Sequence, residues 1–103
     1  MTKTRKYRSF DDILKEKLKS PSFVLGYLNE SLKDNDQGGF LLALRQVVES
    51  RGNITEFAEK VGLPRQSIYR MLSPEGNPTM EKVFAILKAL GLRMQLVMAS
   101  ESK

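Results

Sequence analysis

The sequence predicts a mainly α-helical single domain of five to six helices that ends in a short β-strand. Apolar residues recur every three or four positions through most of residues 10–90, which is the period of an amphipathic helix. Residues that start and stop helices punctuate these runs: serine, asparagine and threonine stand before them, and glycine or proline follows. Residues 92–99 alternate loosely between two faces instead, which is the period of a strand.

The composition favours a binding protein over an enzyme. A chain of 103 residues is the size of one domain. Its net charge of +5 and pI near 9.6 favour an anionic partner, such as nucleic acid or an acidic protein face. The chain has no cysteine and no histidine. This excludes disulfides, zinc fingers and catalysis by thiolate or imidazole, so we expect no metal, no cofactor and no enzymatic activity.

Hydropathy along the chain predicts a cytoplasmic protein with no membrane contact. The N-terminus lacks the apolar core of a signal peptide, and no stretch approaches the 18 uninterrupted apolar residues of a membrane span.

The N-terminal third divides into an arm and a helical segment. Residues 1–8 carry four cations and no acid, which predicts a flexible basic arm. Residues 9–38 form the helical segment. A short helix begins after Ser9, and Ser20 with Pro21 provides an N-cap and a first-turn proline for a second helix that ends near residue 33.

Residues 39–91 form the predicted core. Its first helix, residues 40–51, is apolar over most of its surface and must therefore be central. Asn53 is placed to cap the next helix, and a further helix restarts near residue 65 after the turn Gly-Leu-Pro. Thr79 caps a last helix that is followed by glycine.

The predicted strand, residues 92–99, needs a partner because a lone strand leaves its backbone groups unpaired. It either pairs with a strand of another chain or stays disordered until a partner binds.

The spacing of three small or apolar residues predicts a helix-turn-helix. Two helices that meet at a steep angle need a small residue where they cross, a turn residue that accepts positive φ, and an apolar side chain that fills the angle. Ala58, Gly62 and Ile68 have these properties at the required positions. The motif describes a shape, so DNA binding has to be judged from the outer face.

The outer face of the second motif helix carries side chains that read base edges. Arginine matches guanine, glutamine matches adenine, and serine contacts bases or phosphates. The candidate base readers are Arg65, Gln66, Ser67, Tyr69 and Arg70. The candidate phosphate contacts are Asn53, Thr55, Lys60 and Ser73. Each has an alternative interpretation as a solvated, capping or solubilising side chain.

Between residues 10 and 98 the chain resembles a known family. The segments that carry the resemblance are YLNESL, FLLALRQVVESRG, the helix-turn-helix, LSPEGNPT and KVFAILKALGLRM. They resemble the addiction-module antidote proteins, helix-turn-helix (HigA-like) antitoxins of the lambda-repressor-like superfamily. The resemblance implies a homodimer that neutralises a RelE/ParE-like toxin. It also implies repression of the shared promoter through a palindromic double-stranded DNA operator.

Two residues depart from the pattern of related helix-turn-helix domains. Ile54 stands where many of them have a glutamine that holds phosphate, and Pro64 stands where they cap the second helix with serine or threonine. These departures predict a lower DNA affinity. Two alternatives to the antitoxin stay open, a free-standing repressor and a protein-binding module without DNA binding.

Overall fold

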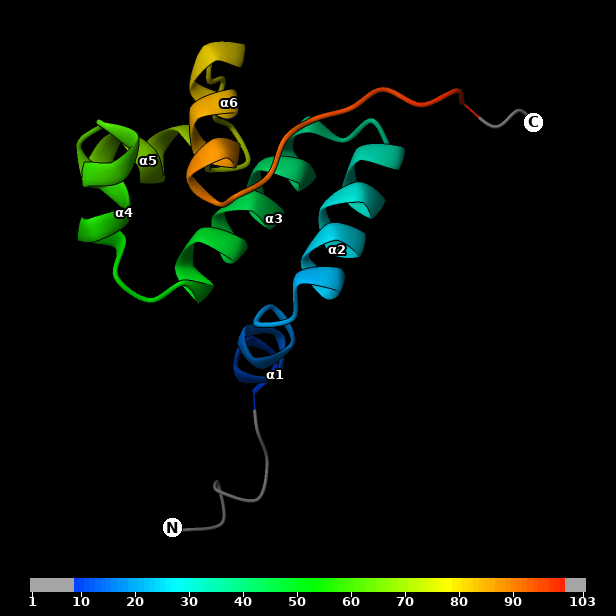
Figure 1. Cartoon of the computed structure of the whole chain (residues 1–103), viewed down its shortest axis with the longest axis horizontal. Helices are drawn as coiled ribbons and strands as arrows, with labels where there is room; N and C mark the ends of the chain where they lie inside the picture. The colour runs from blue at the N-terminus through cyan, green and yellow to red at the C-terminus, as the bar shows by residue number, and fades with distance from the viewer. Residues whose placement is uncertain (1–8, 100–103) are drawn as a thin grey trace, which may run out of the picture.

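The computed structural model describes residues 9–99, which form six α-helices (Figure 1). They are α1 (Phe10–Lys17), α2 (Pro21–Lys33), α3 (Gln37–Ser50), α4 (Ile54–Val61), α5 (Arg65–Met71) and α6 (Met80–Ala89). The prediction of a mainly α-helical chain is confirmed. The predicted arm, residues 1–8, lies outside the described residues.

The helices begin where side chains satisfy the free amides of the first turn. The hydroxyls of Ser9, Ser20 and Thr79 and the amide oxygen of Asn53 each accept a hydrogen bond from a backbone N–H two or three residues later. Pro64, which precedes α5, provides no such bond. Five of the six helix starts, those other than that of α3, therefore lie at the residues that the sequence indicated.

The start of α3 lies three residues earlier than predicted. Asp36 is its N-cap, and the Asp36 carboxylate accepts a hydrogen bond of 3.0 Å from the backbone N–H of Gly39. Gly38 and Gly39, which precede the predicted start at residue 40, lie in the first helical turn. Gly38 has a packing reason: a Cβ there would lie 2.8 Å from the carbonyl oxygen of Pro74.

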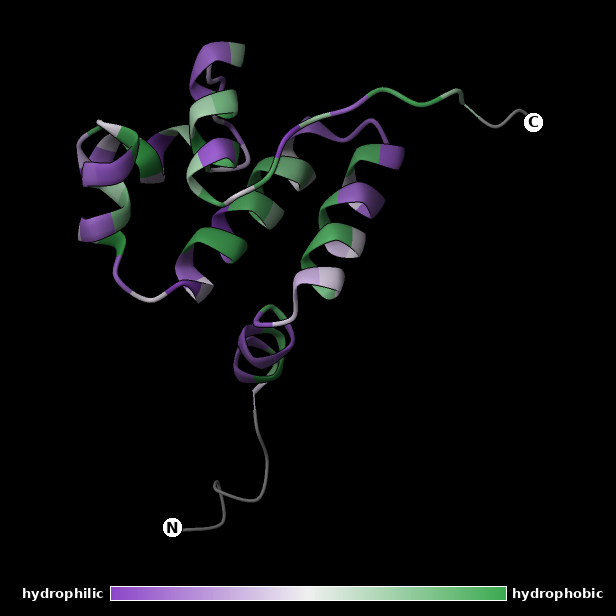
Figure 2. Cartoon of the chain, viewed as in Figure 1, coloured by the Kyte–Doolittle hydropathy of each residue, from purple (hydrophilic) through white to green (hydrophobic). Residues whose placement is uncertain are grey.

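The core is built around α3. Helices α1, α2 and α4 all pack against it, and α4 also contacts α5 and α6. Figure 1 shows α3 in the middle of the molecule, and Figure 2 shows hydrophobic residues along it. Its inward residues are fully or nearly fully buried: Phe40, Leu41, Ala43, Leu44, Val47 and Val48. The strongly apolar helix is central, as the sequence indicated.

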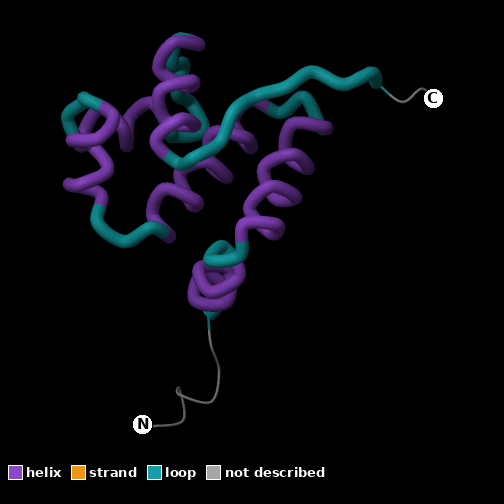
Figure 3. The backbone as a smooth tube through the Cα atoms, viewed as in Figure 1, coloured by secondary structure: helices purple, strands orange, loops and turns teal. Residues whose placement is uncertain are grey.

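The prediction of a C-terminal strand is not confirmed for the described chain. After Gly91, residues 92–99, called the tail below, run as an extended loop, and no strand occurs between residues 9 and 99 (Figure 3). The backbone N–H of Leu92 donates to the carbonyl of Leu87, but residues 93–99 make no backbone hydrogen bond within the described part. The reason is that a strand requires a neighbouring strand, and residues 9–99 of one chain provide none.

Candidate nucleic-acid interface

The joint between α4 and α5 is short and closely packed. Gly62 ends α4 with φ of 83°, a conformation that glycine adopts without strain. The backbone N–H groups of Gly62 and Leu63 both donate to the carbonyl of Ala58, at 2.8 and 3.1 Å. Ala58 and Ile68 are buried in the core. The three residues singled out for this joint thus lie at the turn or on the buried sides of the two helices.

Helix α5 has one buried and one exposed side. Ile68, and Leu72 just after the helix, are buried at 1% and 0% exposure. Three of the predicted base readers, Arg65, Gln66 and Arg70, are exposed, whereas Ser67 is half-buried. The buried pair fixes the rotation of the helix, so the arginines and the glutamine are presented to solvent.

Tyr69 is placed differently from the other predicted readers. Its ring is half-buried, and the Arg45 guanidinium from α3 lies 5.0 Å from the ring centroid. Arg45 is itself held by Glu49, with 3.2 Å between Nε and the carboxylate oxygen. Stacking under a cation holds the ring against α3. Sequence reasoning missed Arg45, although it is the one cation within α3.

Three of the four predicted phosphate contacts have partners within the chain. The Asn53 side chain accepts from the backbone N–H groups of Thr55 and Glu56, at 3.0 and 3.2 Å. The Ser73 hydroxyl donates to the carbonyl of Arg70 at 2.9 Å, and Lys60 makes a long contact of 3.5 Å to the carbonyl of Ala89. Asn53 therefore caps α4, and Lys60 remains exposed.

Thr55 and Arg65 come together at a shallow surface hollow. They line it with the residues of the turn between α4 and α5, and Glu59 lines it as well. A predicted phosphate contact and a predicted base reader thus share one surface. Glu59 adds a negative charge there, which repels a phosphate group.

The loop between α5 and α6 packs closely against the backbone at the end of α5. A Cβ on Gly76 would overlap the carbonyl of Met71, with the carbonyl carbon 2.7 Å away. Gln37 of α3 also donates to the carbonyl of Gly76 at 3.5 Å. Close packing against the end of α5 explains the turn-forming residues of this loop.

Two replacements of Asn53 test how much its capping of α4 contributes to stability. Asn53→Ala is expected to lower the free energy of unfolding by about 1 kcal/mol, because two first-turn amides lose their acceptor. Asn53→Asp keeps that acceptor and is expected to leave stability nearly unchanged. Denaturant unfolding of the two variants measures the difference. An equal loss of stability in the two variants would show that the side-chain acceptor at position 53 does not account for it.

The remaining chemical features lie away from this surface. Burial raises the pKa of the Tyr27 hydroxyl, which donates to the side-chain carbonyl of Gln46 between α2 and α3. Within residues 9–99, no three carboxylates are grouped as metal ligands. None of the helices described is long and apolar enough to cross a bilayer.

Comparison with known proteins identifies the family. A family model described as "Probable addiction module antidote protein" matches residues 6–98. This chain belongs to that family. The chain is also 34% identical, over 93 residues, to an uncharacterized protein of Haemophilus influenzae (strain ATCC 51907 / DSM 11121 / KW20 / Rd). The alignment covers 90% of this chain and 93% of that protein. No solved structure matches this chain.

The family description has two consequences. A family of probable addiction-module antidotes implies a cognate toxin as partner and a regulatory role. The antidote part of the sequence-based resemblance is therefore confirmed.

Proposed function

We propose that this antidote is a DNA-binding antitoxin of a type II toxin–antitoxin module, with a lambda-repressor-like helix-turn-helix formed by α4 and α5. In this role it neutralises a RelE/ParE-like toxin, as HigA-like antitoxins do, and represses the shared promoter in the cytoplasm as a dimer. One observation supports the proposal most. Arg65, Gln66 and Arg70 are exposed on α5, while Ile68 anchors the opposite side in the core.

The exposed residues have the chemistry of major-groove readers. The forked donors of Arg65 match O6 and N7 of guanine, and the amide of Gln66 matches N6 and N7 of adenine. Arg70 lies one turn further along α5 and is assigned to a phosphate or base. Ser67 is assigned a secondary contact, and Tyr69 has the least access because Arg45 covers its ring.

The phosphate contacts rest on α4 and on the end of α5. Thr55 and Lys60 are exposed, and Lys60 can exchange its long contact to the Ala89 carbonyl for a backbone phosphate. Asn53 and Ser73 contribute through polar atoms that have closer internal partners. One helix pair contacts few base pairs, so a dimer that reads a palindromic operator supplies the specificity.

Titration of the promoter DNA tests the proposal. The purified protein is titrated against its upstream duplex and an unrelated duplex at two salt concentrations. We expect tight binding to the promoter alone. Gln66→Ala should lose roughly 1–3 kcal/mol of binding free energy on the promoter only, because a base contact is removed. Arg70→Ala should weaken both duplexes and lower the salt slope by about one.

Lys33→Ala is the matched control for the loss of one positive charge. Lys33 is exposed at the end of α2, on the far side of α3 from α5 (Figure 1). Its removal should leave promoter affinity nearly unchanged. Equal, weak binding of the wild-type protein to both duplexes would refute sequence-specific repression.

A toxin-binding module without DNA binding is the second candidate. Two features of the surface favour it: Pro64 precedes α5 without providing a side-chain cap, and the Glu59 carboxylate lies in the same hollow as Arg65. The titration distinguishes the two candidates, because this module would show no preference for the promoter. A free-standing repressor would bind the promoter equally well, and the presence of a toxin gene beside this one separates it from an antitoxin.

A further inference from the structure

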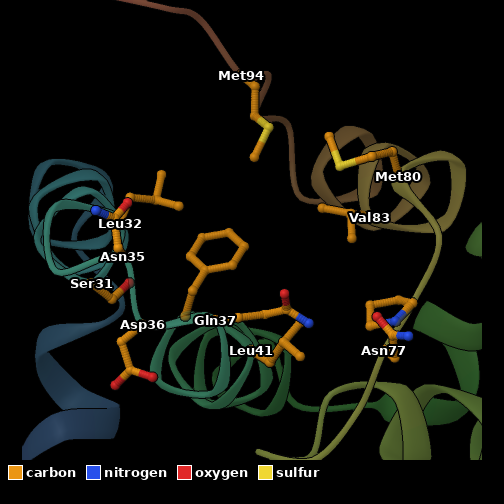
Figure 4. A pocket seen from close by; sticks show the side chains of 12 residues that line it. Ser31, Leu32, Asn35, Asp36, Gln37, Leu41, Asn77, Met80, Val83 and Met94 are labelled. Carbon is orange, nitrogen blue, oxygen red and sulfur yellow. The ribbon is translucent and has the colours of Figure 1, made fainter. Parts of the chain in front are cut away.

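An apolar groove opens between the end of α2, the start of α3 and the start of α6. It has a volume of about 320 Å³. Phe40 and Leu41 of α3 line it. The partly exposed side chains of Leu32, Met80 and Met94 stand around it (Figure 4). Figure 4 shows Met94 reaching into the groove from the tail. Among the residues that the structure describes, the groove is an apolar surface that remains open.

The tail begins on the core and then leaves it. Leu92 packs against the core, and Met94 lines the groove with 39% of its surface exposed. Leu96 and Met98 lie on the same side of the extended tail by alternation, yet they are 97% and 94% exposed. Figure 2 shows this hydrophobic stretch at the free end of the tail. The apolar face of the tail is therefore covered at Leu92, partly covered at Met94 and exposed at Leu96 and Met98.

The tail of the same chain does not fill the groove. An extended chain advances roughly 3.3 Å per residue, so Met98 lies about 13 Å beyond Met94. Residues 95–98 (Gln-Leu-Val-Met) include no glycine, proline, asparagine or aspartate that favours a reversal. A single chain thus carries both an apolar groove and apolar side chains that cannot reach it.

We propose that the tail of a second copy covers this groove, and that the two tails pair as antiparallel strands with Leu96 beside Leu96 of the partner copy. Each copy offers the groove and the side chains that fit it, which is the self-complementarity of a two-fold dimer. The pairing also supplies the neighbouring strand that residues 93–99 lack.

The alternation of the tail fixes the register. With Leu96 on the two-fold axis, Met98 of the second copy lies opposite Met94, on the side that faces the groove. Antiparallel pairing also places Arg93, the one charged residue of the tail, opposite Ala99. Parallel pairing would instead set Arg93 beside its own copy, where like charges repel.

The surface is close to the size that a stable dimer uses. Specific interfaces use roughly 20–30 residues a side. Residues 92–99 and the twelve residues that line the groove, with Met94 common to both, approach that number. The inference rests on the proposed function in one respect: the tail pairing would form the dimer that the proposed repressor needs. Its tests use no DNA.

The mass of the protein in solution tests the dimer. At micromolar concentration the wild-type protein should have twice the chain mass of 11.7 kDa. Leu96→Asp should raise the dimer dissociation constant by about 100-fold or more and yield monomers, because each dimer would bury two carboxylates. Phe10→Asp is the control, an exposed apolar residue on α1, and should remain a dimer. Circular dichroism verifies that both variants fold.

Single cysteines test the register, since the natural chain has none. Leu96→Cys should form an intermolecular disulfide rapidly under mild oxidation, because directly opposite Cβ atoms lie about 4.5–5.5 Å apart. Arg93→Cys should crosslink slowly. A monomeric wild-type protein, a dimeric Leu96→Asp variant, or faster crosslinking at position 93 than at 96 would each overturn the inference.

Failure of this inference is distinguishable from failure of the proposed function. A dimer of the predicted register that ignores the promoter DNA supports the tail pairing and refutes the repressor. A monomer that binds the promoter specifically does the reverse. A tail that pairs only with a toxin would appear as a monomer in isolation and would overturn the inference.

Discussion

Replacement of Leu44 by alanine is expected to lower the free energy of unfolding by roughly 2–5 kcal/mol. Leu44 is completely buried in α3, the helix that contacts α1, α2 and α4. Its truncation removes apolar contacts and leaves a cavity that rigid helices on several sides fill only in part. Small domains have about 5–15 kcal/mol of stability in total, so the variant should be close to unfolding. Denaturant unfolding at 25 °C measures the loss.

Leu42→Ala is the matched control for this cavity. Leu42 lies two residues away on the same helix but is 40% exposed. The same chemical change there should cost less than about 1 kcal/mol, since water already reaches the site. Equal losses at the two positions would show that α3 is not the centre of the core.

Gly76→Ala is expected to destabilise the protein by about 1–3 kcal/mol. The new Cβ would overlap the Met71 carbonyl, and this contact is with backbone, which cannot rotate away. The end of α5 or the loop after it must shift. Thermal unfolding should show a lower Tm, and promoter affinity should fall as well, because Met71 is the last residue of α5.

Gly26→Ala is the opposite case and serves as the control. Gly26 lies within α2, and a Cβ there meets nothing within 4 Å. Alanine favours the helix over glycine by about 0.5–1 kcal/mol, so this variant should be slightly more stable than the wild type. Stabilisation by Gly76→Ala would contradict the close approach at the loop.

The helices could be predicted from the sequence because their signals are local. Ser20 with Pro21, Asn53 and Thr79 act within their own first turns, so their effect is readable without knowledge of the tertiary fold. The start of α3 could not be predicted in this way. Gly38 is tolerated in the first turn because the distant Pro74 packs against it, and a contact between residues far apart in sequence leaves no local signal.

The candidate site was predictable in composition but less so in orientation. The spacing of Ala58, Gly62 and Ile68 indicated which side of α5 faces inward, and Arg65 with Gln66 lies outward. The placement of Tyr69 depends on Arg45 from another helix, which periodicity within α5 cannot reveal. The strand prediction is not confirmed for a related reason: alternation shows that a segment suits a sheet, whereas the sheet itself requires a second strand.

The connection from α6 to the tail is only a few residues long. The backbone N–H of Leu92 donates to the carbonyl of Leu87 at 2.8 Å, and the Leu92 side chain packs on the core. The tail therefore leaves the domain in a fixed direction. In the proposed dimer, the separation of the two DNA-reading helices would then be set by the protein and not by the DNA. The proposed repressor would hold its two α5 helices at a fixed separation. Operators whose half-sites are moved by a single base pair would then be rejected even with every base contact intact.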